Sequence, residues 1–377
     1  MTTISKDTDL RSAMISNYDD YQVSSDKQNL PLDYFNWGRD PRHLVDNTEA
    51  LPTLPQAKNF LKKYLKEFLQ ILQRKLMVRN YYLNQLKRYN GFNETYSLMS
   101  DEYSRTLFSE LLSMQILGEK EFRLSSFDAT LVAAYEEASE KILGSSDVLS
   151  AYKWELRKVF VDSLGINLYT GPDLLHLVYT GRLYRYSQGD RVVEMEPGDI
   201  VLDCGVGWGD TTVSFAAIVE SLGEVHCFEL NQEGLDVLKT QVDVSGTNSQ
   251  VIANRLAVSD TDGEQIFIGE ASPATRITEN RTTGTSVTTT TIDTYCMERG
   301  LARVDFIKMD IEGAEMMALR GACETIAKFK PKLAISAYHK WDDLREIPKL
   351  IKTIRTDYEF YLDCSTGFGG EAVLYCK

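Results

Sequence analysis

A glycine-rich turn flanked by acids is the stretch of this sequence best suited to bind a ligand. Residues 201–212 read VLDCGVGWGDTT, an apolar run that predicts a strand and then a tight turn into a helix. The turn carries two acids and three glycines: Asp203, Gly205, Gly207, Gly209 and Asp210. In an open parallel sheet, this first strand–helix turn is where a nucleotide binds. A dinucleotide fingerprint would place its third glycine at 210, where the aspartate would repel a pyrophosphate. The turn therefore favours a cationic ligand without phosphate.

Glu229 supplies the second half of a nucleoside site. It ends the next expected strand, EVHCFEL, and a carboxylate there can accept hydrogen bonds from both ribose hydroxyls of an adenosine. S-adenosylmethionine combines an adenosine with an ammonium and a sulfonium, which Asp203 and Asp210 would attract. We therefore expect S-adenosylmethionine as the cofactor. An NAD(P)-dependent oxidoreductase and a non-catalytic binding module of the same fold are the alternatives.

Three side chains at later strand ends suit methyl transfer to a hydroxyl. The reaction needs the acceptor oxygen about 3 Å from the methyl carbon, and a base for the hydroxyl proton. His339 ends the strand KLAISAYH and has a near-neutral ordinary pKa, so we predict that it is the general base. Asp310 closes an earlier strand and Glu312 follows in its turn, so both are expected to face the same pocket.

The acids around Asp310 leave one alternative open. Paired carboxylates could hold a divalent metal that orients two substrate oxygens. No second acid at a fixed spacing supports such a site, so no metal is expected. Glu315 begins the following helix, where the helix dipole favours a carboxylate whatever else it does.

The motifs together resemble the FkbM family of S-adenosylmethionine-dependent methyltransferases, a branch of the class I, Rossmann-like group. The resemblance covers 195–377, and its most specific stretch is VDFIKMDIEGAE at 304–315. The other matching stretches are VLDCGVGWGDTT, VHCFELN, NRLAVSDTDG, VTTTTIDTYC and KLAISAYHKWDDLREIP. The resemblance implies methyl transfer to a hydroxyl of a sugar or secondary metabolite. Family members often carry an Arg-His pair near the chain end, where this sequence has Asp363 and Cys364, so the resemblance does not carry the family's acceptor to this chain.

The resemblance also implies a role for each residue of the cofactor site. The methionine end would lie against the first turn, at Asp203, Gly205, Gly207 and Asp210. The adenosine would lie against the ends of the next two strands, at Glu229, Asn231, Arg255, Leu256 and Ala257. Asp310 would lie near the methyl group.

Strands alternate with helices over 166–377, which predicts the scaffold that positions these residues. We expect an α/β fold, a mostly parallel sheet with helices on both faces, forming one Rossmann-like domain. The last two strands, YEFYLDC and EAVLYC, are expected to pair antiparallel around GFGG.

The first part of the chain has a different pattern. Residues 1–54 lack periodicity and predict an irregular arm, whereas 55–165 predict a mainly helical region that covers the site or forms a homodimer contact. Helices are expected near 61–76, 100–118 and 128–143, with a shorter one near 147–160.

Composition narrows the class of partner. The net charge of −14 would repel nucleic acid and an anionic membrane surface, so we expect a hydroxylated small molecule as substrate. The six cysteines show no CxxC pair or zinc-ligand spacing, which favours free thiols. Since neither a signal peptide nor a membrane span is visible, a cytoplasmic location is expected.

Overall fold

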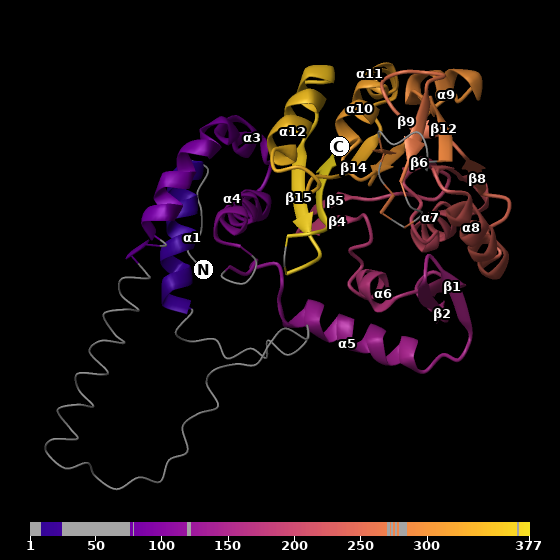
Figure 1. The fold of residues 1–377 in the computed structure, drawn as a ribbon, viewed down its shortest axis with the longest axis horizontal. Coiled ribbons are helices and arrows are strands. Elements are labelled where there is room, and N and C mark those ends of the chain that lie inside the picture. Colours follow the sequence, from indigo (N-terminus) through magenta and orange to yellow (C-terminus); the bar gives the residue numbers. More distant parts are fainter. Residues whose placement is uncertain are drawn as a thin grey trace, which may run out of the picture.

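A seven-stranded sheet forms the centre of the protein (Figure 1). The computed structural model describes residues 9–24, 76–77, 79–118, 122–269, 272, 274–275, 277–278, 285–367 and 369–377. The strands lie in the order β15 (Phe360–Cys364), β16 (Ala372–Cys376), β14 (Lys332–Ser336), β13 (Phe306–Met309), β6 (Ile200–Cys204), β7 (Glu224–Phe228) and β8 (Val251–Asn254). Six strands run in one direction and β16 runs in the opposite direction, so its pairs with β14 and β15 are antiparallel. The expected mostly parallel sheet, with its antiparallel final pair, is confirmed.

Helices cover both faces of this sheet, because alternate residues of each buried strand point to opposite sides. Leu202 and Ile307 pack on one side, whereas Val201 and Phe306 pack on the other. The first side is covered by α4 (Glu102–Leu117), α9 (Ile292–Glu298), α10 (Glu315–Arg320), α11 (Cys323–Phe329) and α12 (Asp343–Ile354). The second side is covered by α6 (Pro172–Tyr179), α7 (Asp210–Val219) and α8 (Gln232–Ser245). A short 3₁₀ turn, η3 (Glu220–Leu222), follows α7.

Three small sheets accompany the central one. A three-stranded antiparallel sheet holds β1 (Val148–Ala151), β2 (Trp154–Val161) and β3 (Ile166–Thr170). A pair is formed by β4 (Tyr186–Gln188) and β5 (Arg191–Val193). A four-stranded sheet holds β11 (Ile277–Thr278), β10 (Gln265–Ile268), β12 (Thr285–Thr290) and β9 (Ala257–Val258).

The short helix expected near 147–160 is wrong, because β1 and β2 occupy that segment. The sequence WELRKVFV of β2 contains β-branched and aromatic residues, which favour strands. Its buried residues, Leu156, Val159 and Val161, join cores shared with α8 and α5. The hydrogen bonds of β2 to β1 on one side and β3 on the other therefore favour a strand in this segment.

Helices dominate the N-terminal part and meet the sheet at its edge. They are α1 (Leu10–Ser24), the 3₁₀ helix η2 (Leu86–Phe92), α3 (Asn93–Leu98), α4 and α5 (Ala129–Leu143). Helix α1 differs from the irregular arm expected for 1–54. The helix expected near 61–76 lies outside the described residues except at its last position. The domain boundaries and dimer contact stay predictions.

Helix α4 confirms the expected helix over 100–118, with one change at its start. The cap is Asp101, whose carboxylate accepts a hydrogen bond from the Ser104 amide at 2.8 Å, and not Ser100. The Ser100 hydroxyl instead accepts a hydrogen bond from the Phe360 amide at 2.9 Å. The start of α4 is thus attached to β15, which covers the edge of the central sheet.

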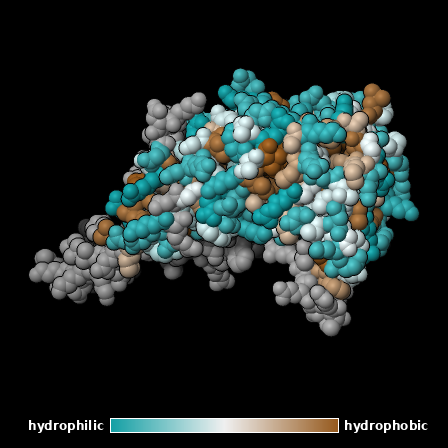
Figure 2. All heavy atoms as spheres, turned by 90° about the horizontal axis from the view of Figure 1, so that it is seen from above, coloured by the Kyte–Doolittle hydropathy of each residue, from teal (hydrophilic) through white to brown (hydrophobic). Residues whose placement is uncertain are grey.

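The surface matches the composition. Seen from above, most of it is hydrophilic, with hydrophobic side chains gathered in small areas (Figure 2). Within the described part of the chain, no helix combines the length and apolar character needed to cross a bilayer.

Candidate active site

The predicted site residues gather where the parallel strands end. Between β6 and α7 the chain turns through Gly205, Gly207 and Gly209, all with positive φ. A Cβ on Gly205 would lie 1.9 Å from the carbonyl oxygen of Asp310. Only glycine therefore lets the first turn lie against the end of β13. A Cβ on Gly207 would meet no described atom within 4 Å, which leaves space beside the turn.

Asp203 is buried and bonded within the protein. Its side chain is 0% exposed and pairs with the Lys308 ammonium at 3.1 Å, while the Thr212 hydroxyl donates to its other oxygen at 2.6 Å. Lys308 also donates to the carbonyl of Gly205 in the first turn. Burial lowers the pKa of Lys308, but Asp203 and Asp310 outweigh burial and raise it above its ordinary value, so the pair is ionic.

Asp210 is also bonded within the protein. The Thr170 hydroxyl, at the end of β3, donates to one carboxylate oxygen at 2.5 Å, and the Thr211 amide donates to the other at 3.0 Å. Burial raises the pKa of Asp210 to about 6. The carboxylates of Asp203 and Asp210 thus already have partners within the protein, whereas the sequence suggests two acids that are available to attract a cation. Their part in cofactor binding stays a prediction.

Glu229 lies at the end of β7 as expected, next to the first turn. One of its carboxylate oxygens accepts from the amides of Leu230 and Asn231, each at 2.8 Å. Burial raises the pKa of this carboxyl, against the opposing effect of these hydrogen bonds. Tyr152, from the turn between β1 and β2, and Glu229 would both contact a Cβ placed on Gly234. The Tyr152 hydroxyl is buried and has no hydrogen-bond partner among the described residues, so a polar ligand group at Glu229 would find a second donor there.

The remaining expected adenosine contacts have structural partners. The Asn231 amide donates to the Thr275 hydroxyl at 2.5 Å, and Arg255 donates to the carbonyl of Leu230 at 3.3 Å. Leu256 is half-buried against the main core, and Ala257 is buried in β9. Arg276, in the polar segment GEASPATRITEN, lies outside the described residues.

Asp310 lies at the end of β13 and receives two phenol groups. The Tyr184 hydroxyl donates to one carboxylate oxygen at 3.0 Å, and the Tyr338 hydroxyl donates to the other at 3.3 Å. Tyr338 also contacts Glu371, from the turn before β16, at 3.4 Å. Burial and the charge of Asp310 raise the pKa of Glu371 to about 7.

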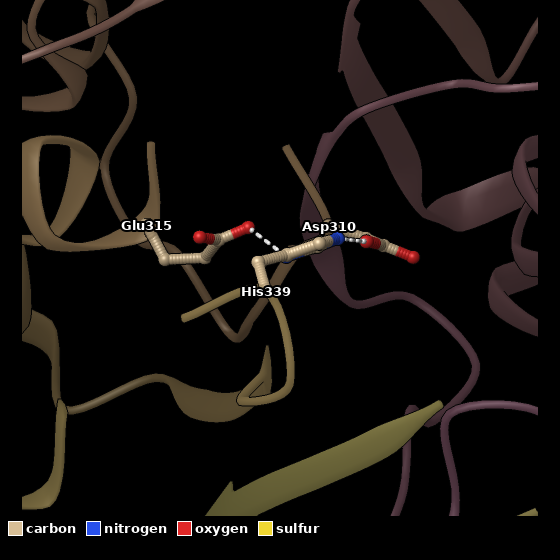
Figure 3. A group of neighbouring side chains, drawn as sticks. All are labelled: Asp310, Glu315 and His339. Atoms are coloured by element: carbon tan, nitrogen blue, oxygen red, sulfur yellow. Dashed lines mark ion pairs between the residues drawn. The ribbon is translucent and has the colours of Figure 1, made fainter. Parts of the chain in front are cut away.

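His339 lies between carboxylates (Figure 3). Its Nδ1 is 2.9 Å from Oε1 of Glu315. Its Nε2 is 3.5 Å from Asp310 and 3.8 Å from Glu312. The imidazole is 4% exposed and Glu315 is 1% exposed. Burial lowers the pKa of His339, but the three acids, Glu315 first, raise it above its ordinary value. His339 conversely holds the pKa of Glu315 below its ordinary value despite burial.

The turn of MDIEGAE fixes Glu315 in this position. The same Oε1 atom accepts from the amides of Ile311 at 3.0 Å and Gly313 at 3.3 Å. Glu312 occupies the left-handed region at φ 57°, and Gly313 follows at φ 94°. The tight turn therefore presents its backbone amides to Glu315 and its Glu312 carboxylate to His339.

This arrangement supports two kinds of chemistry. A histidine with Nδ1 directed at a carboxylate can accept a proton at Nε2. Asp310, Glu315 and His339 also offer ligand atoms within 4.8 Å of one another, which would suit a divalent metal ion.

The structure brings together residues that sequence reasoning did not connect. Glu315 was attributed to the helix dipole, although its spacing after Asp310 in MDIEGAE was available as a signal. Tyr184 lies in the Tyr-rich segment at 168–186. It contacts Asp310, whereas Tyr186 is buried and stacks on Tyr361. No sequence signal marked Tyr152.

Part of the chain matches a known protein family. Residues 203–360 match the family described as the methyltransferase FkbM domain. No curated protein matches the chain. Among solved structures, the chain is similar to a methyltransferase FkbM from Methylobacillus flagellatus KT, with 18% identity, a TM-score of 0.49, and coverage of 79% of this chain and 60% of that one. This chain thus spans less than two thirds of that protein.

Two further solved structures are similar to parts of this chain. One is a SAM-dependent methyltransferase from Aquifex aeolicus, with 14% identity, a TM-score of 0.30, and coverage of 48% of this chain and 84% of that one. The other is fibrillarin from Aeropyrum pernix, in complex with natively bound S-adenosyl-L-methionine, with 14% identity, a TM-score of 0.31, and coverage of 61% and 98%.

Proposed function

We propose that this protein transfers a methyl group to a hydroxyl of a sugar or natural-product molecule, and the match of residues 203–360 to the methyltransferase FkbM domain supports this proposal. The cofactor is S-adenosylmethionine. The observation that carries the proposal is the position of His339, held by Glu315 at Nδ1 and facing Asp310 with Nε2 at the end of the sheet.

The residues present fit the cofactor. The carboxylate of Glu229, fixed by two backbone amides, and the unpaired hydroxyl of Tyr152 would bind the ribose. The open space at Gly207 would admit the methionine end, and Asp310 would lie near the methyl group. S-adenosylmethionine supplies an electrophilic methyl group on a sulfonium and is released as S-adenosylhomocysteine.

His339 acts as the general base in this mechanism. Its Nε2 accepts the proton of the acceptor hydroxyl while that oxygen forms its bond to the methyl carbon. Glu315 stabilises the imidazolium that forms, and the raised pKa of His339 makes it a stronger base.

The alternatives receive less support. An NAD(P)-dependent oxidoreductase would place a pyrophosphate at the start of α7, where Asp210 stands. A non-catalytic module would have no use for a buried Glu–His pair at the rim. A metal at Asp310 and His339 would occupy Nε2 and remove the base, so the two mechanisms exclude each other. A cytoplasmic location is part of the proposal, supported by six cysteines that are free thiols.

Calorimetry tests the cofactor assignment. The protein should bind S-adenosylhomocysteine and not NAD, and the reverse would overturn the proposal. Glu229→Gln should weaken this binding about tenfold to a hundredfold, because a charged acceptor for hydrogen bonds contributes about 1.5–3 kcal/mol. Asp236→Asn is the matched control, since Asp236 is exposed on the neighbouring helix α8.

Methyl transfer tests the base. His339→Gln should retain the affinity for S-adenosylhomocysteine and lose about 10²–10⁴-fold in the rate of transfer from labelled S-adenosylmethionine to hydroxylated acceptors. A variant with full activity would remove His339 from the mechanism.

A further inference from the structure

A cavity of about 370 Å³ lies between the N-terminal helical part and the end of the central sheet. Helix α4 contributes Leu111, Met114 and Gln115 to its wall. The opposite wall includes Tyr338, Leu344 of α12 and Ala372 of β16. Its volume lies within the range of about 300–1,000 Å³ that small-molecule sites have.

The cavity adjoins the proposed base. Tyr338 lines it and is followed in the chain by His339, with the two ring centroids 4.2 Å apart. The Tyr338 hydroxyl contacts Asp310 at 3.3 Å and Glu371 at 3.4 Å. A molecule in the cavity would therefore reach the acid–histidine group across one aromatic side chain.

The lining indicates the chemistry of the occupant. Leu111, Met114, Leu344 and Ala372 are apolar, and they would bind an apolar surface through the hydrophobic effect. A sugar, with hydroxyls on every side, would leave many polar groups without partners against these walls. An apolar molecule that carries a hydroxyl fits the apolar walls and also supplies the oxygen that accepts the methyl group.

A second hollow, of about 20 Å³, is too small for an acceptor molecule. Its polar lining includes Arg182 and Asp363, which form an ion pair at 2.6 Å. The Tyr103 hydroxyl also bonds to Asp363 at 2.6 Å. These groups already satisfy one another, so they offer little to a ligand.

We propose that the methyl acceptor binds in the larger cavity and is a predominantly apolar molecule with a hydroxyl directed past Tyr338 toward His339. This inference rests on the proposed function and narrows its acceptor to the apolar natural-product class. It also assigns α4, outside the domain matched at 203–360, a wall of the acceptor site.

Binding of a probe to the full chain tests this assignment. In the presence of saturating S-adenosylhomocysteine, calorimetry would compare 2-naphthol, an apolar alcohol, with methyl β-glucoside. We expect 2-naphthol alone to bind. Gln115→Trp should weaken 2-naphthol binding at least about tenfold, because Gln115 is an exposed residue on the cavity wall where a larger side chain fills space without disturbing the core.

The control is Glu102→Trp, an equally large substitution at an exposed position of the same helix outside the cavity. It should leave 2-naphthol binding unchanged, and both variants should bind S-adenosylhomocysteine as the wild type does. Binding of methyl β-glucoside in preference to 2-naphthol, no 2-naphthol binding, or equal binding by Gln115→Trp would overturn the cavity assignment. If the wild type does not bind S-adenosylhomocysteine, the proposed function is overturned instead.

Discussion

Replacement of Glu315 by glutamine isolates the charge that acts on His339. Three groups approach one atom, Oε1: the amides of Ile311 and Gly313, and Nδ1 of His339 at 2.9 Å. A glutamine can keep its carbonyl oxygen at this place, accept from both amides and remain next to Nδ1 of His339. The variant therefore loses the negative charge and keeps the contacts.

The size of the stabilisation that Glu315 gives to the His339 imidazolium depends on the burial of the pair. The contact is an ion pair, and two unit charges about 4 Å apart attract by about 1 kcal/mol in water and by more at a lower effective dielectric constant, so the imidazolium should lose at least about 1 kcal/mol of stabilisation. Solvent screens little of this, because Glu315 is 1% and His339 4% exposed. Since the lost interaction favours the charged imidazole, the pKa of His339 should fall in Glu315→Gln.

Nuclear magnetic resonance of the imidazole signals measures this pKa without an acceptor molecule. The chain has four histidines, and the signal missing from His339→Gln identifies that of His339. The midpoint in the wild type should lie above the ordinary value of about 6.5 and should drop in Glu315→Gln. Glu324→Gln, at an exposed position of α11, should leave it unchanged. An unchanged or higher midpoint in Glu315→Gln would refute the assigned interaction.

The same pair predicts a pH dependence of stability. The folded pKa of His339 is raised, so its contribution is full below the unfolded value of about 6.5 and is lost as pH rises through the folded pKa. The folded pKa of Glu315 is lowered, so its contribution is present above about 4.3 and is lost as pH falls through the folded pKa. The difference in free energy of unfolding between wild type and Glu315→Gln should therefore be largest between about pH 5 and 6.5 and shrink toward pH 9. Urea titrations at these pH values measure it, and a constant difference would contradict the ionic pair.

Three further predictions concern the turn and the metal alternative. Lys308→Met leaves the buried Asp203 carboxylate without its cation and should lower the free energy of unfolding in urea by about 3–5 kcal/mol. The double variant that adds Asp203→Asn should recover much of this loss. A loss under about 1 kcal/mol would show that the ion pair contributes little to stability. Gly205→Ala places a Cβ 1.9 Å from the Asp310 carbonyl oxygen and should lower the free energy of unfolding by on the order of 3 kcal/mol. Gly207→Ala has open space around its Cβ and should lower it by less. Equal losses would refute the close approach at Gly205. Addition of EDTA and then of Mg²⁺ should leave the His339 titration midpoint unmoved, and a downward shift with Mg²⁺ would favour a metal at Asp310 and His339.

The sequence determined the central sheet and the line of its site residues. Apolar strands alternating with helices specify a parallel sheet, and the ends of its strands then share one edge, so Gly205, Glu229, Asp310 and His339 had to be neighbours. These features depend on local pattern and on the shared edge at which parallel strands end, and a linear reading captures both. Where the pattern was weak, as over β1 and β2, the prediction of a helix was wrong.

Only the tertiary structure decided what each acid does. Asp203 and Asp210 look alike in the first turn, yet Lys308 neutralises one and Thr170, from β3, bonds to the other. Glu315 binds His339, which lies one strand away. The cavity wall on α4 was equally invisible, because it depends on how that helix packs against the edge of the sheet. A charge acts through distance and burial, and both are set by which strands and helices lie side by side, which no single segment of the sequence records.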